Sequence, residues 1–321
     1  MGGTHIAAIA KRTDAHLGAV CTLNGKALQG DFRDSGGNLN RPGVLFDFSA
    51  VKKYADWREL VGDSDLDAVD ICLPTDMHAT VSMEALKAGK HVLCEKPMAL
   101  TYDECVRMMS AAEQSGKILM IGQVLRFWPE YMALLSFVEG AEYGAVRQAT
   151  FTRRCGLPDW SKWLPDEKRS GGALMDLLVH DVDQALRLFG MPAKVAAKRI
   201  GADDAVMATL IYPGGPEVRI QGGWFAAETP FSMSFQVRAE RAALEMTPEG
   251  LMLSDRTGQR RKLELDGTDG YEGEVNYFVD CCTGGKQPEL CMPKESAAAV
   301  KVALAMKESR AKDGEQVACL G

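Results

Sequence analysis

Residues 68–97 read AVDICLPTDMHATVSMEALKAGKHVLCEKP, and the fold class is most directly indicated by this stretch. Two apolar runs, AVDICLP at 68–74 and HVLC at 91–94, flank a segment that is long enough for a helix. Apolar runs without polar alternation are typical of parallel strands that are buried on both faces. The stretch therefore predicts a strand–helix–strand unit whose second strand ends directly in Glu95-Lys96-Pro97.

The same rhythm extends to both sides of this unit, with apolar runs GAVCTL at 18–23 and KILMIG at 117–122. A helix is expected to open at Thr101, where Thr101 and Glu104 have the spacing of a capping box. Strands that alternate with helices predict a Rossmann-type, doubly wound α/β domain, here over residues 1–124. Residues 29–42 are rich in Gly, Asn and Asp and are expected to form a loop insertion.

The pattern changes after about residue 190 to strands without intervening helices. KVAAKRI, AVMATLIY, EVRIQGGWF and SMSFQVRA follow one another, separated by turns. They predict a second, α+β domain over residues 125–321 with a large, mainly antiparallel open sheet. Two late helical patterns, around 272–283 and 295–310, are expected to cover this sheet or to pack back on the first domain.

Composition narrows the class of protein. The 321 residues carry a formal net charge of -7, which argues against a broad surface for nucleic acid or anionic membrane, since both need clustered Lys and Arg. The nine cysteines are scattered without a CxxC pair, as expected for reduced thiols. No run approaches the roughly 20 apolar residues of a membrane span. We expect a soluble, cytoplasmic protein that binds small molecules.

Polar residues follow two neighbouring predicted strands. Glu95 and Lys96 end the run HVLC, and Thr75 and His78 follow the preceding run. Open α/β sheets bind ligands at the edge where their strands end. Taken alone, Glu95 and Lys96 are more typical of a solvated turn pair than of a site.

A second group of polar residues lies in SGGALMDLLVHDVDQALRLFG at 170–190, whose apolar spacing predicts one helix. Asp176, His180 and Asp183 then share one stripe of that helix. Three interpretations remain open from the spacing. The residues form a surface salt bridge, an acid/base pair in which the carboxylate orients the imidazole, or a divalent metal site.

Together and in this order, the motifs resemble those of the Gfo/Idh/MocA family, which is named after glucose–fructose oxidoreductase and inositol dehydrogenase. The resemblance covers PTDMH at 74–78, AGKHVLCEKPMAL at 88–100, VLRFWPEY at 124–131 and the GG-x3-D-x3-H pattern at 171–180. It implies hydride transfer between NAD or NADP and a sugar, sugar acid or cyclitol, without a metal. It also implies a homo-oligomer formed through the sheet of the second domain.

The resemblance also implies roles for single residues. Lys96, Asp176 and His180 form the catalytic set: His180 exchanges the hydroxyl proton, Lys96 stabilises the reacting oxygen, and Asp176 holds the substrate or the lysine. Expected substrate contacts, besides these three, are Arg126, Arg153 and Trp163, with Arg154, Phe127, Trp128 and Trp160 as further cleft residues. Expected cofactor contacts are Gly2, Thr22, Leu73, Thr75, His78, Glu95, Lys96 and Gln123.

The chain departs from the family pattern at two places. Met1-Gly2-Gly3-Thr4-His5 matches only the tail of a G-x-G-x-x-G turn and the start of its helix, so only Gly2 stands for a fingerprint glycine. We therefore expect the natural protein to begin upstream, with the missing first strand. Thr22 stands where an acidic residue commonly binds the ribose hydroxyls, which leaves NAD and NADP equally compatible.

Two other functions remain compatible with these motifs. One is a catalytically silent binding or regulatory homologue that keeps the fold. The other is a redox-neutral lyase or glycosidase that holds NAD and oxidises its substrate only transiently.

Overall fold

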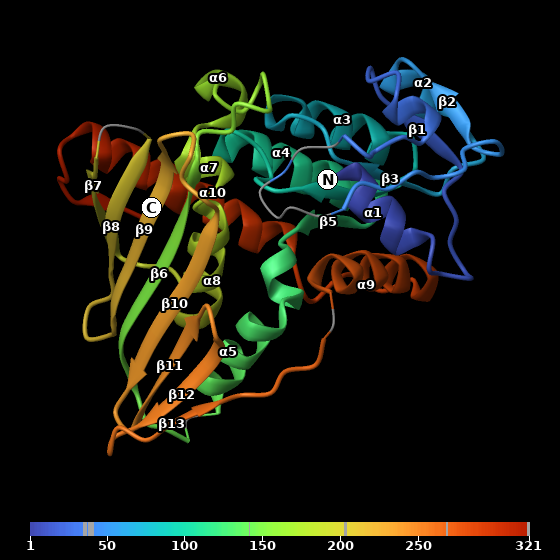
Figure 1. Cartoon of the computed structure of the whole chain (residues 1–321). Helices are drawn as coiled ribbons and strands as arrows, with labels where there is room; N and C mark the ends of the chain where they lie inside the picture. The colour runs from blue at the N-terminus through green and yellow to red at the C-terminus, as the bar shows by residue number, and fades with distance from the viewer. Residues whose placement is uncertain (35–36, 38–41, 141, 202–203, 268, 320–321) are drawn as a thin grey trace.

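The computed structural model describes residues 1–34, 37, 42–140, 142–201, 204–267 and 269–319. A large sheet and a smaller α/β part lie next to each other, with α10 (Pro293–Ala311) extending from one to the other and α9 (Gly270–Gly284) lying against the α/β part (Figure 1). The expected loop insertion at 29–42 lies partly outside the described residues. Within the described part, Asp31 forms an isolated bridge to Leu45, which lies just after the expected insertion.

The α/β part contains two parallel sheets. β3 (Ala68–Ile71), β4 (His91–Glu95) and β5 (Leu119–Gly122) pair in this order, and β1 (Ala19–Cys21) pairs with β2 (Lys52–Tyr54). Among the described residues, no strand joins β1 to β3. The expected parallel α/β architecture is confirmed.

Helices cover both faces of the β3–β4–β5 sheet. Along β4, Val92 and Cys94 belong to a core that includes residues of α3, α4 and α10, whereas Leu93 packs in a core with residues of α1 and α9. This two-sided burial explains why β4 is apolar without alternation. The helices that contribute are α1 (Gly2–Ile9), α3 (Thr75–Lys87), α4 (Tyr102–Ser115), α9 (Gly270–Gly284) and α10 (Pro293–Ala311), and α2 (Trp57–Gly62) packs beside β1 and β2.

Two local predictions about helices are confirmed. The Thr101 hydroxyl accepts from the Glu104 N–H, and the Glu104 carboxylate accepts from the Thr101 N–H, which completes the capping box of α4. The two late helices exist as α9 and α10, and both pack back on the α/β part. Among the described helices, none has the length and apolar character needed to cross a membrane.

The second part is built on a nine-stranded sheet with the order β13-β12-β11-β10-β6-β9-β8-β7-β14. Its described pairs are antiparallel except β6 with β9, so the sheet is mixed but mainly antiparallel, as expected. The four predicted strands are β7 (Lys194–Arg199), β8 (Ala205–Ile211), β9 (Glu217–Phe225) and β10 (Ser232–Ala239). Sequence reasoning missed β6 (Val146–Gly156), β11 (Ala242–Thr247), β12 (Gly250–Asp255), β13 (Arg260–Lys262) and β14 (Val317–Ala318).

One face of this sheet carries the larger core. Phe151 of β6 and Phe235 of β10 are buried there with Val182 of α8 (Val179–Phe189). Helix α5 (Pro129–Glu139) and helix α10 complete this layer (Figure 1). On the opposite face, Met207 and Arg219 are exposed.

The prediction of one helix across 173–189 is wrong. The chain forms α7 (Ala173–Asp176), leaves the helix at Leu177 and Leu178, and begins α8 at Val179. The break separates Asp176 from His180 and Asp183, which both lie on α8, so the three residues do not form one stripe of a single helix. The Asp183 carboxylate instead accepts from the Arg126 Nε and Nη2 at 2.9 and 2.6 Å.

Arg126 joins elements that are distant in sequence. It lies on the short helix η2 (Val124–Phe127), its side chain is 3% exposed, and it pairs with Asp183 of α8 and with Glu295 of α10. Its neighbour Arg187 also donates to the Arg126 carbonyl oxygen at 3.5 Å. Because a buried guanidinium needs compensating charge, the junction depends on Asp183.

We expect Asp183→Asn to lower the free energy of unfolding by about 3 to 5 kcal/mol, since it leaves a buried charge without its bidentate partner. Glu295→Gln is the matched control, because it removes the other partner of the same guanidinium. The Glu295 side chain is 34% exposed, so its loss should cost about 1 kcal/mol or less. Urea unfolding followed by circular dichroism measures both, and equal losses would contradict this assignment.

Candidate active site

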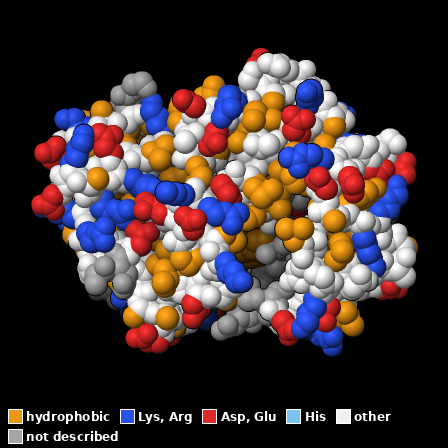
Figure 2. Space-filling view, turned by 90° about the horizontal axis from the view of Figure 1, so that it is seen from above, with side chains coloured by type: hydrophobic (Ala, Val, Ile, Leu, Met, Phe, Trp, Pro, Cys, Tyr) orange, Lys and Arg blue, Asp and Glu red, His pale blue; other side chains and the backbone are white. Residues whose placement is uncertain are grey.

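A cavity of about 910 Å³ lies between the two parts of the molecule. Its walls come from the start of α1, the segments after β1, β3 and β4, the loop before α6 (Glu167–Ser170), and the α7–α8 region. Figure 2 shows the molecule hollowed on the face seen from above, with hydrophobic side chains gathered around the hollow. This size suits a bound small molecule.

Lys96, Asp176 and His180 all line this cavity. The Lys96 Nζ donates to the Asp176 main-chain oxygen at 2.7 Å and lies 3.2 Å from the Asp176 Oδ1. Lys96 follows β4 and Asp176 ends α7, so the contact joins the edge of the parallel sheet to the second part. The three expected catalytic side chains are therefore brought to one wall.

His180 is not hydrogen-bonded to Asp176 in the described part of the chain. Among the described residues, its Nδ1 is buried without a hydrogen-bond partner. Burial lowers the pKa of His180 well below its ordinary value, and the positive charges of Lys96 and Arg153 lower it further. The ring is therefore neutral at pH 7 and able to accept a proton.

Contacts with the side chains of Glu95 and His78 hold the backbone around Lys96 in place. The Lys96 N–H donates to the Glu95 Oε2 at 3.0 Å. The two ring nitrogens of His78 lie 2.8 Å from the Pro97 carbonyl oxygen and 2.9 Å from the Leu73 carbonyl oxygen. His78 thus ties together the segments that follow β3 and β4.

Five of the eight expected cofactor residues line the cavity, namely Gly2, Thr22, Leu73, Glu95 and Lys96. Thr75, His78 and Gln123 are buried and do not line it. Gln123 is instead 3.4 Å from the Ser296 hydroxyl of α10. A position just after a strand end therefore predicted the region of the cavity correctly. It did not predict which side chains face the cavity.

Some of the expected substrate residues line the cavity, and others do not. Arg153, Trp163 and Trp160 line the cavity. The Arg153 guanidinium is held by Asp181 at 2.9 and 3.0 Å and by the Tyr131 hydroxyl at 3.2 Å. Arg126 is not brought to the cavity, because Asp183 and Glu295 hold it at the junction described above.

Two further cleft residues have other surroundings. The Arg154 guanidinium lies over the Phe225 ring, 4.4 Å from its centroid, and does not line the cavity. Phe127 is buried, whereas Trp128 lines the cavity.

Sequence reasoning missed several lining residues, among them Phe32, Cys72 and Tyr271. Tyr271 lies in the first turn of α9, which is capped by Asp269. Its place in the cavity follows from the return of α9 to the α/β part, and periodicity within α9 does not reveal this return.

The start of α1 faces the cavity through Met1, Gly2, Gly3 and Thr4. A Cβ built on Gly2 would meet no other atom within 4 Å, so the backbone there can be approached closely. N–H groups at the start of a helix, together with the helix dipole, favour an anionic group. This wall therefore has the chemistry of a phosphate site.

Two family models match the chain. Residues 38–123 match the oxidoreductase family with the NAD-binding Rossmann fold, and residues 131–245 match the GFO/IDH/MocA C-terminal domain. Together they cover both parts that border the cavity.

Similar relatives include two named sugar enzymes. D-xylose 1-dehydrogenase (NADP(+)) 2 of Haloferax volcanii is 30% identical over 270 residues, which cover 80% of this chain and 82% of that protein. The 1,5-anhydro-D-fructose reductase of Ensifer adhaerens is 29% identical over 252 residues, which cover 74% of this chain and 75% of that protein.

A solved structure of levoglucosan dehydrogenase, in complex with NADH and levoglucosan, has a TM-score of 0.83 with 20% identity. The match covers 100% of this chain and 97% of that one, and it shows that the two share a fold. The two family models and the relative at 30% identity lead to one conclusion: the chain belongs to the Gfo/Idh/MocA family of oxidoreductases.

Proposed function

We propose that the protein is an NAD(P)-dependent oxidoreductase that transfers a hydride between a nicotinamide and a carbinol carbon of a sugar, sugar acid or cyclitol. The observation that carries the proposal is the Lys96 amine, hydrogen-bonded to Asp176 on the same cavity wall as His180. The named activities of the xylose, anhydrofructose and levoglucosan enzymes support a sugar as the substrate class.

The dinucleotide fits the wall formed by α1. Gly2 and the first N–H groups of α1 would hold the pyrophosphate, and Thr22, Leu73 and Glu95 would line its path. When bound, the nicotinamide would accept or return the hydride. Thr22 carries no charge that would repel a 2′-phosphate, so we propose NAD or NADP as the cofactor.

Lys96 would act on the reacting oxygen. Its ammonium group is anchored to the Asp176 main-chain oxygen and carboxylate, and an ammonium group has a third proton to donate. A donor that is held in place stabilises negative charge as it develops on the substrate oxygen. Asp176 would keep the amine in this position.

His180 would accept the hydroxyl proton during oxidation and return it during reduction. Because its pKa is lowered by burial and by neighbouring positive charge, the neutral form is present at pH 7. Arg153 and Trp163 would contact the sugar, with the indole face against C–H groups of the ring.

The assembly and the domain limits belong to the same proposal. We propose a homo-oligomer formed through the face of the nine-stranded sheet that carries Met207 and Arg219. Residues 1–124 would bind the dinucleotide, and residues 125–321 would bind substrate and form the oligomer.

Lys96→Met tests the proposed function. We expect kcat for sugar oxidation to fall by about 100-fold or more, since a held donor to the reacting oxygen is lost. Binding of NADH and NADPH, followed by nicotinamide fluorescence, should stay largely unchanged.

Lys307→Met is the matched control for this substitution. The Lys307 side chain is 25% exposed against 17% for Lys96, and it also donates to a main-chain oxygen, that of Gly171 at 3.0 Å. It lies outside the cavity wall and should keep full activity. No binding of either cofactor would favour a silent homologue, and turnover without net cofactor reduction would favour a redox-neutral enzyme.

The pH dependence tests the role of His180. Because the folded protein holds the pKa of His180 well below 6.5, kcat/KM for oxidation should stay level from pH 8 to about 6.5 and fall only at lower pH. In His180→Gln this acid limb should disappear, and the plateau should drop by about 100-fold. His16→Gln, at an exposed histidine, should keep the limb. A limb that persists in His180→Gln would remove His180 from the proton-transfer step.

A further inference from the structure

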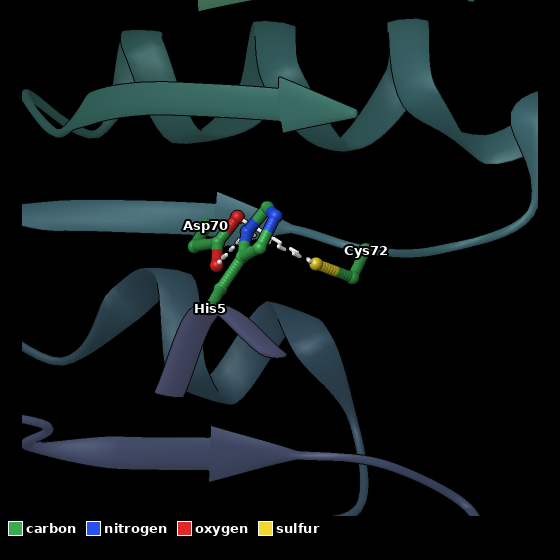
Figure 3. Close-up of side chains that lie close together, drawn as sticks. All are labelled: His5, Asp70 and Cys72. Atoms are coloured by element: carbon green, nitrogen blue, oxygen red, sulfur yellow. Dashed lines mark hydrogen bonds and ion pairs between the residues drawn. The ribbon is translucent and has the colours of Figure 1, made fainter. Parts of the chain in front are cut away.

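Next to the cavity lies a buried polar cluster around His5, in which only Glu95 has a place in the proposed function, as a residue that lines the path of the dinucleotide. His5 of α1 is fully buried, and its Nδ1 lies 2.8 Å from the Asp70 Oδ2 and 3.6 Å from the Cys72 Sγ. Figure 3 shows the His5 ring reaching from α1 to Asp70 on β3 and to Cys72 just beyond that strand. The Asp70 contact fixes the tautomer, because a carboxylate accepts only from a protonated Nδ1.

The other ring nitrogen faces two carboxylates. The His5 Nε2 lies 3.3 Å from the Glu95 Oε1 and 3.9 Å from the Glu274 Oε1, and these three atoms all lie within 4.8 Å of one another. Nε2 and both Glu274 oxygens are buried, and they make no hydrogen bond among the described residues. Buried polar atoms without partners destabilise the folded chain, and more so when they are charged. The cluster therefore has three buried atoms around one point, each of which can ligate a metal ion.

We propose that the His5 Nε2 and the carboxylates of Glu95 and Glu274 bind one divalent transition-metal ion, with Zn²⁺ as the expected ion. Tetrahedral zinc with bonds near 2.0 to 2.2 Å places its ligand atoms ~3.3 to 3.5 Å apart. The pair from His5 to Glu95 matches this spacing, and the pair from His5 to Glu274 needs only a small shift.

Three features of the cluster suit a bound transition metal. The Asp70 carboxylate on Nδ1 reproduces the outer contact that orients ligating imidazoles. Imidazole suits Zn²⁺ rather than Mg²⁺ or Ca²⁺. The charge of the ion would balance the two buried carboxylates.

The metal would connect parts that are distant in sequence. His5 lies on α1, Glu95 ends β4, and Glu274 lies on α9. The Glu95 Oε2 already accepts the Lys96 N–H at 3.0 Å, so a metal on Oε1 would hold the carboxylate that positions the Lys96 backbone. The site is therefore structural, and it lies directly beneath the proposed catalytic lysine.

Zinc titration of the full, metal-stripped chain against a chromogenic chelator tests this site. We expect one tight Zn²⁺ per chain. Loss of an outer contact typically weakens metal affinity by 10- to 100-fold, so Glu274→Gln should weaken it by about 100-fold or more. Glu272→Gln is the matched control, because Glu272 lies on the same helix and pairs with Lys11 instead. It should bind zinc as the unmodified chain does.

The melting temperature is a second measurement, which keeps the test decisive if a variant folds poorly. Zn²⁺ should raise the Tm of the unmodified chain and of Glu272→Gln but not that of Glu274→Gln. Cobalt in place of zinc should give a tetrahedral spectrum without a sulfur charge-transfer band. Absence of tight binding to the unmodified chain would overturn the proposal. So would binding that survives in Glu274→Gln but is lost in Cys72→Ser, because that result places the ion on Nδ1 and the thiol.

Discussion

The site depends on one contact, the hydrogen bond from the Lys96 amine to the end of α7. Lys96 follows the central strand of the β3–β4–β5 sheet, and Asp176 is the last residue of α7. The amine therefore links the edge of the parallel sheet, where such folds bind ligands, to the second part of the molecule. The helix break after Asp176 leaves its carbonyl oxygen free to accept from Lys96.

Charged side chains lie both beside the cavity and beneath it. Burial lowers the pKa of His180, and the positive charges of Lys96 and the Asp181-held Arg153 lower it further, so the ring is neutral. Below them, the carboxylate of Glu95 has one oxygen on the Lys96 N–H and the other toward His5. The end of β4 thus contributes residues both to the cavity and to the buried cluster.

Many of the helices and strands, and the family, could be predicted from the sequence. Which side chains face the cavity could be predicted only in part. Apolar runs gave β1, β3, β4, β5 and four strands of the large sheet because burial on one or both faces leaves a direct pattern. The break between α7 and α8 left no such pattern, since Leu177 and Leu178 suit a continuous helix. Arg126 was expected at the substrate, yet its partners Asp183 and Glu295 come from elements whose packing is tertiary. His5 and Glu274 had no local signal, because α1 and α9 meet only in the folded chain.

The proposed function requires hydride transfer from a sugar carbon in this cavity. It is tested most directly with a sugar that carries deuterium on the carbon to be oxidised, incubated with the protein and the oxidised cofactor. We expect reduced cofactor with the deuterium at C4 of the nicotinamide. Reduced cofactor without the label, or loss of the label to water with no net reduction, would contradict it.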